Sequence, residues 1–150
     1  MNGNENVLPP FIRAMNGRLV PPTHSFLVTV NRRQIAIPGS EVLYFEADGF
    51  YTKVHTTFPD TPYLIRACLN IIEQQAPATH FCRIHRSYII GIYHFDQIEK
   101  DLVNIAKKDL TLSRQYRGRL QERLRMTGFI SLGEYGSNSG KTDVTESGLE

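Results

Sequence analysis

Short apolar runs separated by polar residues fill most of the chain, and this pattern predicts β-strands rather than long helices. Runs rich in β-branched and aromatic residues occur at 26–30, 35–37, 42–47, 50–56, 62–66, 102–105 and 110–112. The polar residues between successive runs are typical of tight turns. We therefore expect mainly antiparallel hairpins.

Three hairpins are predicted from these turns. The polar residues 31–34 separate the first two runs, and Lys107, Lys108 and Asp109 separate the last two. Between 42–47 and 50–56 lie Asp48 and Gly49, residue types that accept the positive φ angles of a type I′ turn. The last pattern gives the strongest local prediction of antiparallel pairing.

Two segments have helical periodicity instead. Leu69, Ile72 and Ala76 recur at helical spacing, and Pro77 should end that helix because its ring cannot continue the backbone hydrogen bonds. A second helix is expected to begin after Ser113, a residue type whose hydroxyl can accept a free backbone N–H. It has an apolar stripe formed by Tyr116, Leu120 and Leu124.

The 150 residues, 41% of them hydrophobic, are enough for one ordinary domain. Residues 1–25 include four prolines and have no clear period, so we expect an N-terminal arm or linker. Residues 126–150 are predicted to form a flexible acidic tail, which leaves 26–125 as the functional domain. No stretch approaches the roughly 18 apolar residues of a membrane span and no secretory signal is evident, so we expect a cytoplasmic protein.

Charge is unevenly distributed along the chain. The net charge is only +2, yet residues 26–125 contain 14 Lys and Arg against 10 Asp and Glu. Residues 126–150 contain one Lys against four acids. The central domain is therefore basic, and the acidic C-terminal segment masks this in the total.

The sequence motifs give little support for metal binding or catalysis. Cys68 and Cys82 both lie beside apolar residues and are expected to be reduced core residues, since two thiols do not make a disulfide framework. The spacing of Cys82 and His85 is a weak metal motif, and no metal or other cofactor is expected. Phosphate-binding glycine loops, zinc-protease motifs and nucleophile elbows are absent from the sequence, so an enzyme is not expected.

The second predicted helix has an excess of positive charge. Residues 113–125 contain five arginines against the single acid Glu122. A solvated surface is the ordinary explanation of such a helix. Here the excess begins at the helix N-terminus, where free N–H groups already favour an anion, so binding to a polyanion is the better interpretation.

A second polar cluster lies in residues 81–90, with the sequence F-C-R-I-H-R-S-Y-I-I. Arginine, histidine and hydroxyl side chains alternate here with apolar anchors. Such a segment can hold polar groups toward base edges or phosphates. For His85 a core histidine bonded to the backbone is an equal alternative.

Together these motifs resemble the LytTR DNA-binding family. The resemblance rests on V-L-Y-F-E-A-D-G-F-Y at 42–51, on residues 81–90, and on L-S-R-Q-Y at 112–116, in this order and at fitting spacing across 26–125. It implies a mostly β fold of several small antiparallel sheets with two short helices, and DNA contacts made from loops. The chain departs from the family at Phe50 and Gly91, where members commonly have Asn.

The resemblance also implies three contact regions in this chain: the strand after the E-A-D-G turn, the H-R-S segment and the start of the last helix. By its chemistry Arg86 suits guanine and Gln115 suits adenine. The residues expected to hold phosphates are Lys53, Ser87, Ser113, Arg114 and Arg117. For Thr52, a base contact and a simple structural role in the strand are equal alternatives.

The sequence therefore predicts sequence-specific binding of double-stranded DNA by a bacterial transcription regulator, with bases read in the major groove. Family resemblance implies repeated half-sites, a possible homodimer on DNA and a link to response regulators. One alternative is an RNA or single-strand binding module using Phe50, Tyr51, Tyr88 and Tyr116, although we interpret these aromatic residues as core. The other is a protein-interaction domain.

Overall fold

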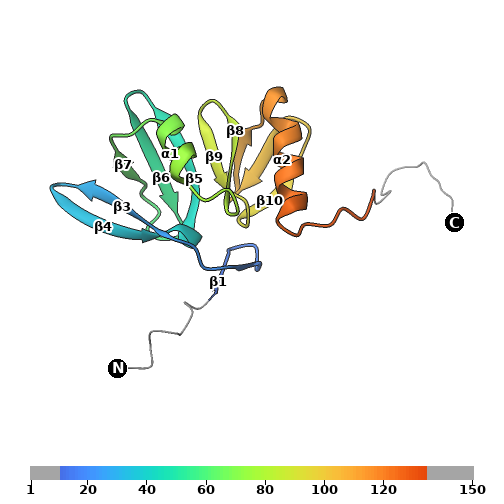
Figure 1. Cartoon of the computed structure of the whole chain (residues 1–150), viewed down its shortest axis with the longest axis horizontal. Helices are drawn as coiled ribbons and strands as arrows, with labels where there is room; N and C mark the ends of the chain where they lie inside the picture. Colours follow the sequence, from blue (N-terminus) through green and yellow to red (C-terminus); the bar gives the residue numbers. More distant parts are fainter. Residues whose placement is uncertain (1–10, 135–150) are drawn as a thin grey trace, which may run out of the picture.

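The computed structural model describes residues 11–134, and within them the chain forms short strands and two α-helices (Figure 1). The strands are β1 (Ile12–Arg13), β2 (Leu19–Val20), β3 (Ser25–Val30), β4 (Arg33–Pro38), β5 (Val42–Asp48), β6 (Tyr51–Thr56), β7 (Tyr63–Ile65), β8 (Phe81–His85), β9 (Tyr88–Gly91), β10 (Phe95–Ile98), β11 (Leu102–Ile105) and β12 (Lys108–Thr111). The helices are α1 (Leu69–Gln75), α2 (Arg114–Met126) and the short 3-10 helix η2 (Gly39–Glu41).

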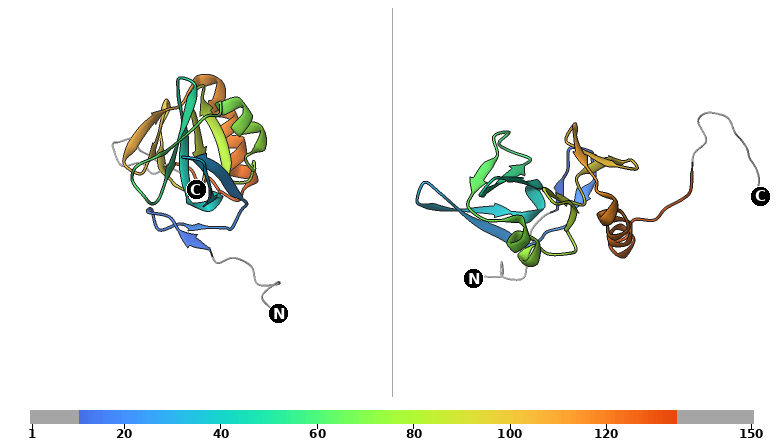
Figure 2. Two further views of the ribbon diagram at one scale, coloured as in Figure 1. Left: turned by 90° about the vertical axis from the view of Figure 1, so that its left-hand side faces the viewer. Right: turned by 90° about the horizontal axis from the view of Figure 1, so that it is seen from above.

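These strands form four small antiparallel sheets. The central sheet has the order β7-β6-β5-β9-β8, a second has β10-β11-β12, and β3-β4 and β1-β2 are separate hairpins. Seen from above, α1 and α2 lie along one side of the molecule and the hairpin of β11 and β12 projects from the other (Figure 2). The mostly β fold with two short helices is confirmed.

The central sheet separates two hydrophobic cores, because successive strand residues face opposite sides. Phe45, Val54 and Ile89 pack with residues of α1 and of the β3-β4 hairpin. On the other face Ile84 and Ile90 pack with residues of α2 and of the β10-β11-β12 sheet. Both helices are thus fixed to the central sheet by buried apolar side chains.

One close backbone contact explains a departure from the family sequence. At Gly91 in β9, a Cβ atom would lie 2.6 Å from the carbonyl oxygen of Val42. A side chain at this position would force β9 and β5 apart. Glycine therefore fits the close approach of these two strands in this chain.

The predicted hairpins are confirmed, but two of their turns lie one residue away from the expected place. Asp48 pairs with Tyr51, so the β5-β6 turn consists of Gly49 and Phe50. Only Gly49 has a positive φ there, which is the pattern of a type II′ turn and not of type I′. The β11-β12 turn likewise centres on Ala106 and Lys107, both at positive φ.

The predicted helices are confirmed at their expected places. Ala76 follows the last residue of α1, directly before Pro77, and Ser113 is the N-cap residue of α2. The side chain of Ser113 makes no capping hydrogen bond, contrary to expectation. Cys82 is buried as expected, whereas Cys68 is exposed.

The described part of the N-terminal segment packs against the domain. Residues 11–20 form the β1-β2 hairpin, in which Val20 is only 1% exposed. Asn16 and Arg18 donate hydrogen bonds to the carbonyl oxygen of Phe95 at 2.8 and 3.0 Å. The arm expected at 1–25 is therefore attached along residues 11–24, and residues 1–10 lie outside the described residues.

The C-terminal segment is also attached at its start. Phe129 packs on Phe95 with ring centroids 5.7 Å apart, and the Arg18 guanidinium lies over both rings. The flexible tail expected at 126–150 lies mainly outside the described residues, which end at 134. In 11–134 no helix is long and apolar enough to cross a membrane.

Candidate nucleic-acid interface

Three segments that are distant in sequence meet along one edge of the domain. The β5-β6 turn, the β8-β9 turn and the first turn of α2 lie along the upper edge in Figure 1. The Ala47 N–H donates to the carbonyl oxygen of Ser87 at 2.9 Å, and the Ser113 N–H donates to that of Ile84 at 2.9 Å. These bonds join the three segments into one frame.

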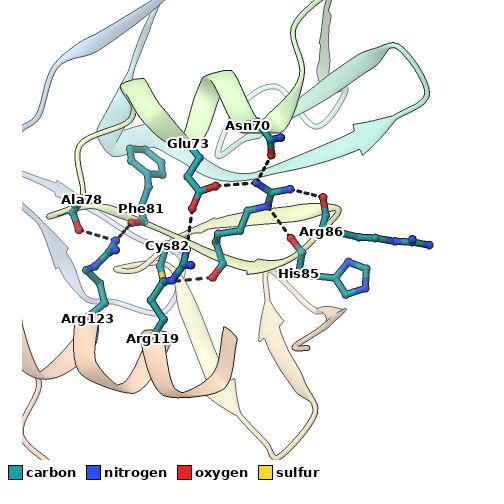
Figure 3. Close-up of polar contacts among 10 residues, drawn as sticks. Asn70, Glu73, Ala78, Phe81, Cys82, His85, Arg86, Arg119 and Arg123 are labelled. Atoms are coloured by element: carbon teal, nitrogen blue, oxygen red, sulfur yellow. Dashed lines mark hydrogen bonds and ion pairs between the residues drawn. The ribbon is translucent and has the colours of Figure 1, made fainter. Parts of the chain in front are cut away.

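The β8-β9 turn presents His85, Arg86 and Ser87. Arg86 is exposed, and its side chain extends away from the neighbouring polar contacts (Figure 3). His85 Nδ1 accepts the Ser87 N–H at 2.9 Å. The backbone of the turn therefore bonds to its own domain while a long cationic side chain faces outward.

The surroundings of His85 favour its neutral form. Burial lowers its pKa, and the charges of Arg86 and Arg83 lower it further. Because Nδ1 already accepts a hydrogen bond, the neutral ring carries its proton on Nε2. The ring is therefore bonded to backbone, while His85 is only half-buried and not a core residue.

The guanidinium of Arg83 donates hydrogen bonds to the carbonyl oxygens of His85 and Arg86 in this turn. Its side chain is only 7% exposed and pairs with Glu73 of α1 at 2.8 Å. Sequence reasoning did not single out Arg83. The sequence did contain a signal for this residue. Arg83 lies between apolar residues of a strand, and a charged side chain buried in such a strand needs a partner.

The start of α2 offers two exposed polar side chains, Arg114 and Gln115. Ser113 is half-buried at the N-cap position. Arg117 is half-buried, and its Nε has no hydrogen-bond partner within residues 11–134. These four expected contact residues therefore lie on one helical turn.

The remaining arginines of α2 make contacts within the domain. Arg119 bonds Glu73 at 2.8 Å, Arg123 bonds the carbonyl oxygens of Ala78 and Phe81, and Arg125 pairs with Glu122. The positive excess of α2 is thus partly neutralised or used for packing. Arg114 and Arg117, at the start of the helix, are not among these paired arginines.

Lys53 and Thr52 lie on opposite faces of β6. The Lys53 side chain is 39% exposed, and its Nζ lies 3.9 Å from Asp48. Thr52 is fully buried, with 0% exposed, and its hydroxyl donates to the carbonyl oxygen of Ala67 at 2.6 Å. Of the two alternatives expected for Thr52, its burial favours the strand residue over the base contact, because the side chain is part of the core.

Two aromatic residues that we interpreted as core are exposed. Phe50 at the tip of the β5-β6 turn is 86% exposed, and Tyr51 beside it is 41% exposed. Tyr88 and Tyr116 are half-buried against the core. The shift of the turn by one residue explains the difference, because it moves Phe50 out of the strand.

The described residues contain no cluster of three or more His, Cys, Asp or Glu side chains that could hold a metal ion. The free polar groups of the edge are instead hydrogen-bond donors and cations. Such groups suit phosphates and the acceptor atoms of bases. We therefore call the edge formed by the β5-β6 turn, the β8-β9 turn and the first turn of α2 the candidate interface.

Comparison with known proteins gives a consistent result. A family model described as the LytTr DNA-binding domain matches residues 32–125. The structure is similar to a LytTr DNA-binding domain of a putative methyl-accepting/DNA response regulator from Bacillus cereus, with a TM-score of 0.58 and 23% identity. That similarity covers 68% of this chain and 97% of the other, and it concerns the fold.

Two curated relatives are longer proteins. The CO-responsive transcriptional regulator RcoM of Rhodospirillum rubrum is 37% identical over 59 residues, which are 39% of this chain and 24% of the relative. Sensory transduction protein LytT of Bacillus subtilis is 23% identical over 107 residues, 67% of this chain and 44% of the relative. The matches thus span less than half the length of either relative.

Proposed function

This chain belongs to the LytTR DNA-binding domain family, and from that premise we propose that it binds double-stranded DNA sequence-specifically as the DNA-binding domain of a bacterial transcription regulator. Bases are read in the major groove from the candidate interface. The relatives, a transcriptional regulator and a sensory transduction protein by name, support this role. Because the family binds DNA, the positive charge of the central domain is explained without any enzymatic activity.

Arg86 and Gln115 are the proposed base-reading residues. Both are exposed, and they lie on the β8-β9 turn and the first turn of α2. A guanidinium can donate two hydrogen bonds to O6 and N7 of guanine, and a carboxamide can pair with N6 and N7 of adenine. This chemistry gives each side chain a different preferred base.

The proposed phosphate contacts surround these two residues. Lys53, Ser87, Ser113, Arg114 and Arg117 offer charges or hydroxyl groups, and His85 offers its outward Nε2–H. Thr52 is omitted from the set because it is buried. Phosphate contacts fix the position of a protein on DNA without selecting a sequence.

The observation that carries the proposal is the direct backbone bonding among the three segments, Ala47 to Ser87 and Ser113 to Ile84. Side chains on segments joined in this way can meet one DNA duplex together. A surface built from unconnected loops would have to be ordered at a cost in binding free energy. The frame therefore favours specific recognition over loose electrostatic attraction.

The decisive experiment is selection of bound duplexes from a random-sequence library, followed by titration of the selected duplex with salt. We expect a recurring sequence motif and an affinity that falls steeply as salt rises, because phosphate contacts release counterions. Repeated half-sites in the selected duplexes, and a protein dimer on them, are part of the proposal. Selection without any motif would contradict sequence-specific recognition.

Single-strand or RNA binding is the second candidate, and the exposed Phe50 and Tyr51 favour it. Exposed aromatic rings can stack on unpaired bases, typically with about 1–3 kcal/mol per base. Under this alternative the chain would prefer single-stranded DNA or RNA over the selected duplex, and Phe50→Ala would remove the preference. A third candidate, a protein-interaction domain, predicts nucleic-acid binding that is weak and insensitive to sequence.

A further inference from the structure

Arg83 forms four hydrogen bonds beneath the β8-β9 turn, and from them we propose that it is a positioning residue for Arg86, setting the shape of the turn that carries this base-reading side chain. The inference rests on the proposed function. Arg83 itself touches no DNA in this proposal. It acts from inside the domain, through the backbone of the turn.

The contacts of Arg83 are divided between the turn and α1. Its Nε donates to the carbonyl oxygen of His85 at 2.8 Å, and its Nη2 donates to that of Arg86 at 2.6 Å. On the other side Nη1 donates to Asn70 Oδ1 at 3.0 Å and to Glu73 Oε1 at 2.8 Å. One planar group thus joins two consecutive carbonyls of the turn to α1.

The arrangement requires arginine. A buried charge is costly unless it is paired and hydrogen-bonded, and the 7% exposed side chain of Arg83 meets both conditions. The rigid fork of a guanidinium can donate in several fixed directions at once. A lysine ammonium has three donors on a flexible stem and cannot hold both carbonyls and both α1 side chains with the same geometry.

The rest of the turn is fixed by its own hydrogen bonds. The Ser87 N–H is bonded to His85 Nδ1, and the Ser87 carbonyl oxygen accepts the Ala47 N–H. With the two carbonyls held by Arg83, these backbone groups all face the domain. The side chain of Arg86 therefore leaves a turn whose conformation is set before DNA arrives, which reduces the ordering cost of binding.

Glu73 extends the same network to the second proposed reading segment. Its other oxygen, Oε2, accepts a hydrogen bond from Arg119 of α2 at 2.8 Å. The carboxylate therefore links the anchor of the β8-β9 turn to the helix that begins with Arg114 and Gln115 (Figure 3). A movement of α1 would therefore alter the positions of both proposed reading segments.

The test is a double-mutant cycle between Arg83→Lys and Arg86→Ala, measured with the best duplex from the selection and with a scrambled duplex of equal composition. Arg83→Lys should weaken binding to the selected duplex roughly tenfold or more, with less than about a twofold effect on the scrambled one. In the Arg83→Lys background, Arg86→Ala should then cost only about twofold or less. Such coupling is expected only if Arg83 acts through Arg86.

A second variant keeps the test valid if Arg83→Lys does not fold. Asn70→Ala removes an exposed partner of Arg83 and leaves Glu73 in place, so the fold should persist. It should weaken binding to the selected duplex and reduce the effect of Arg86→Ala. Gln74→Ala, at an exposed position of the same helix, is the matched control and should change neither quantity.

Additive losses in the cycle, or equal losses on both duplexes, would overturn the positioning role. Failure of the proposed function has a different signature. In that case Arg86→Ala alone, in the unaltered protein, would leave binding to the selected duplex unchanged.

Discussion

The backbone N–H of Ser113 donates a hydrogen bond to the carbonyl oxygen of Ile84 across 2.9 Å. Ile84 is fully buried in β8, one residue before His85, and Ser113 is the residue from which α2 begins. The bond therefore fixes the start of a helix next to a turn that lies almost thirty residues earlier in the chain. Because the two segments are rigidly connected, a substitution on either segment should alter the contacts of the substituted residue and leave the arrangement of the segments unchanged.

Arg86→Ala should cost about 1–3 kcal/mol of binding free energy on the selected duplex and relax the base preference at one position. The reason is the loss of the two donors that we propose to pair with a guanine. Binding measured on selected and scrambled duplexes checks this. Arg125→Ala, at the far end of α2, should have no such selective effect, and equal losses on both duplexes for Arg86→Ala would refute its reading role.

Lys53→Ala should weaken binding to all duplexes alike and reduce the slope of log affinity against log salt by about 1. Lys53 is partly exposed on the solvent side of β6, so the change removes one proposed phosphate contact and little packing. Salt titrations of the two proteins provide the measurement. Lys53→Arg keeps the charge and should preserve the slope; an unaltered slope for Lys53→Ala would argue that no phosphate lies there.

Thr52→Val should lower the free energy of unfolding by about 1–3 kcal/mol, because it leaves the Ala67 carbonyl oxygen without its donor. DNA affinity of the folded protein should be unchanged. Urea unfolding and a binding titration test the two parts separately. Thr52→Ser retains the hydroxyl and should recover part of the stability. A selective loss of specific DNA binding in Thr52→Val would instead indicate that Thr52 contacts a base.

Val20→Ala should lower the free energy of unfolding by about 1–3 kcal/mol, since Val20 is buried where the N-terminal hairpin joins the domain. Leu19→Ala is a matched control next to it, because Leu19 is 52% exposed and should matter little. Thermal or urea unfolding of both variants gives the comparison. Equal stability of Val20→Ala and the parent protein would mean that the hairpin is not part of the cooperative fold.

Stability should decrease as pH falls below the ordinary histidine pKa of 6.5. His94 is 5% exposed and donates from Nε2 to the Ser40 carbonyl oxygen at 2.8 Å. Burial lowers its pKa, with smaller contributions from Arg18 and His80. The unfolded chain therefore binds more protons between 6.5 and the lower pKa of the folded state, and stability is lost through that window.

Urea unfolding between about pH 7.5 and about pH 5.5 measures this dependence. His94→Gln keeps an N–H donor for Ser40 but cannot titrate, so it should have a flatter profile. Burial also lowers the pKa of His55 and His85, so part of the dependence should remain. An unchanged profile in His94→Gln would contradict the assignment.

The alternation of apolar and polar residues was sufficient to predict most elements of the central domain. It predicted the hairpin of β5 and β6, the end of α1 before Pro77 and the stripe of α2 that buries Leu120 and Leu124. These features are encoded locally, because the period of apolar residues records which face of each element is covered. The family motifs likewise identified the three segments of the candidate interface in their order along the chain.

Local patterns could not predict the turn residues or the partners of the charges. Pairing of Asp48 with Tyr51 moved the turn by one residue and exposed Phe50, since register depends on the facing strand as well as on the turn. Thr52, in contrast, shares a face of β6 with the buried Val54, as alternation along a strand requires.

The same limit applies to Arg119 and Arg123 of α2, because their partners inside the domain are distant in sequence. Arg119 meets Glu73, 46 residues earlier in the sequence, and Arg83 meets the same carboxylate from another strand. The charge and the periodic position of each residue follow directly from the sequence. Only the packing of α1, α2 and β8 decided which charges are neutralised inside the domain and which remain free to meet DNA, because an ion pair depends on distance in space and not on distance along the chain.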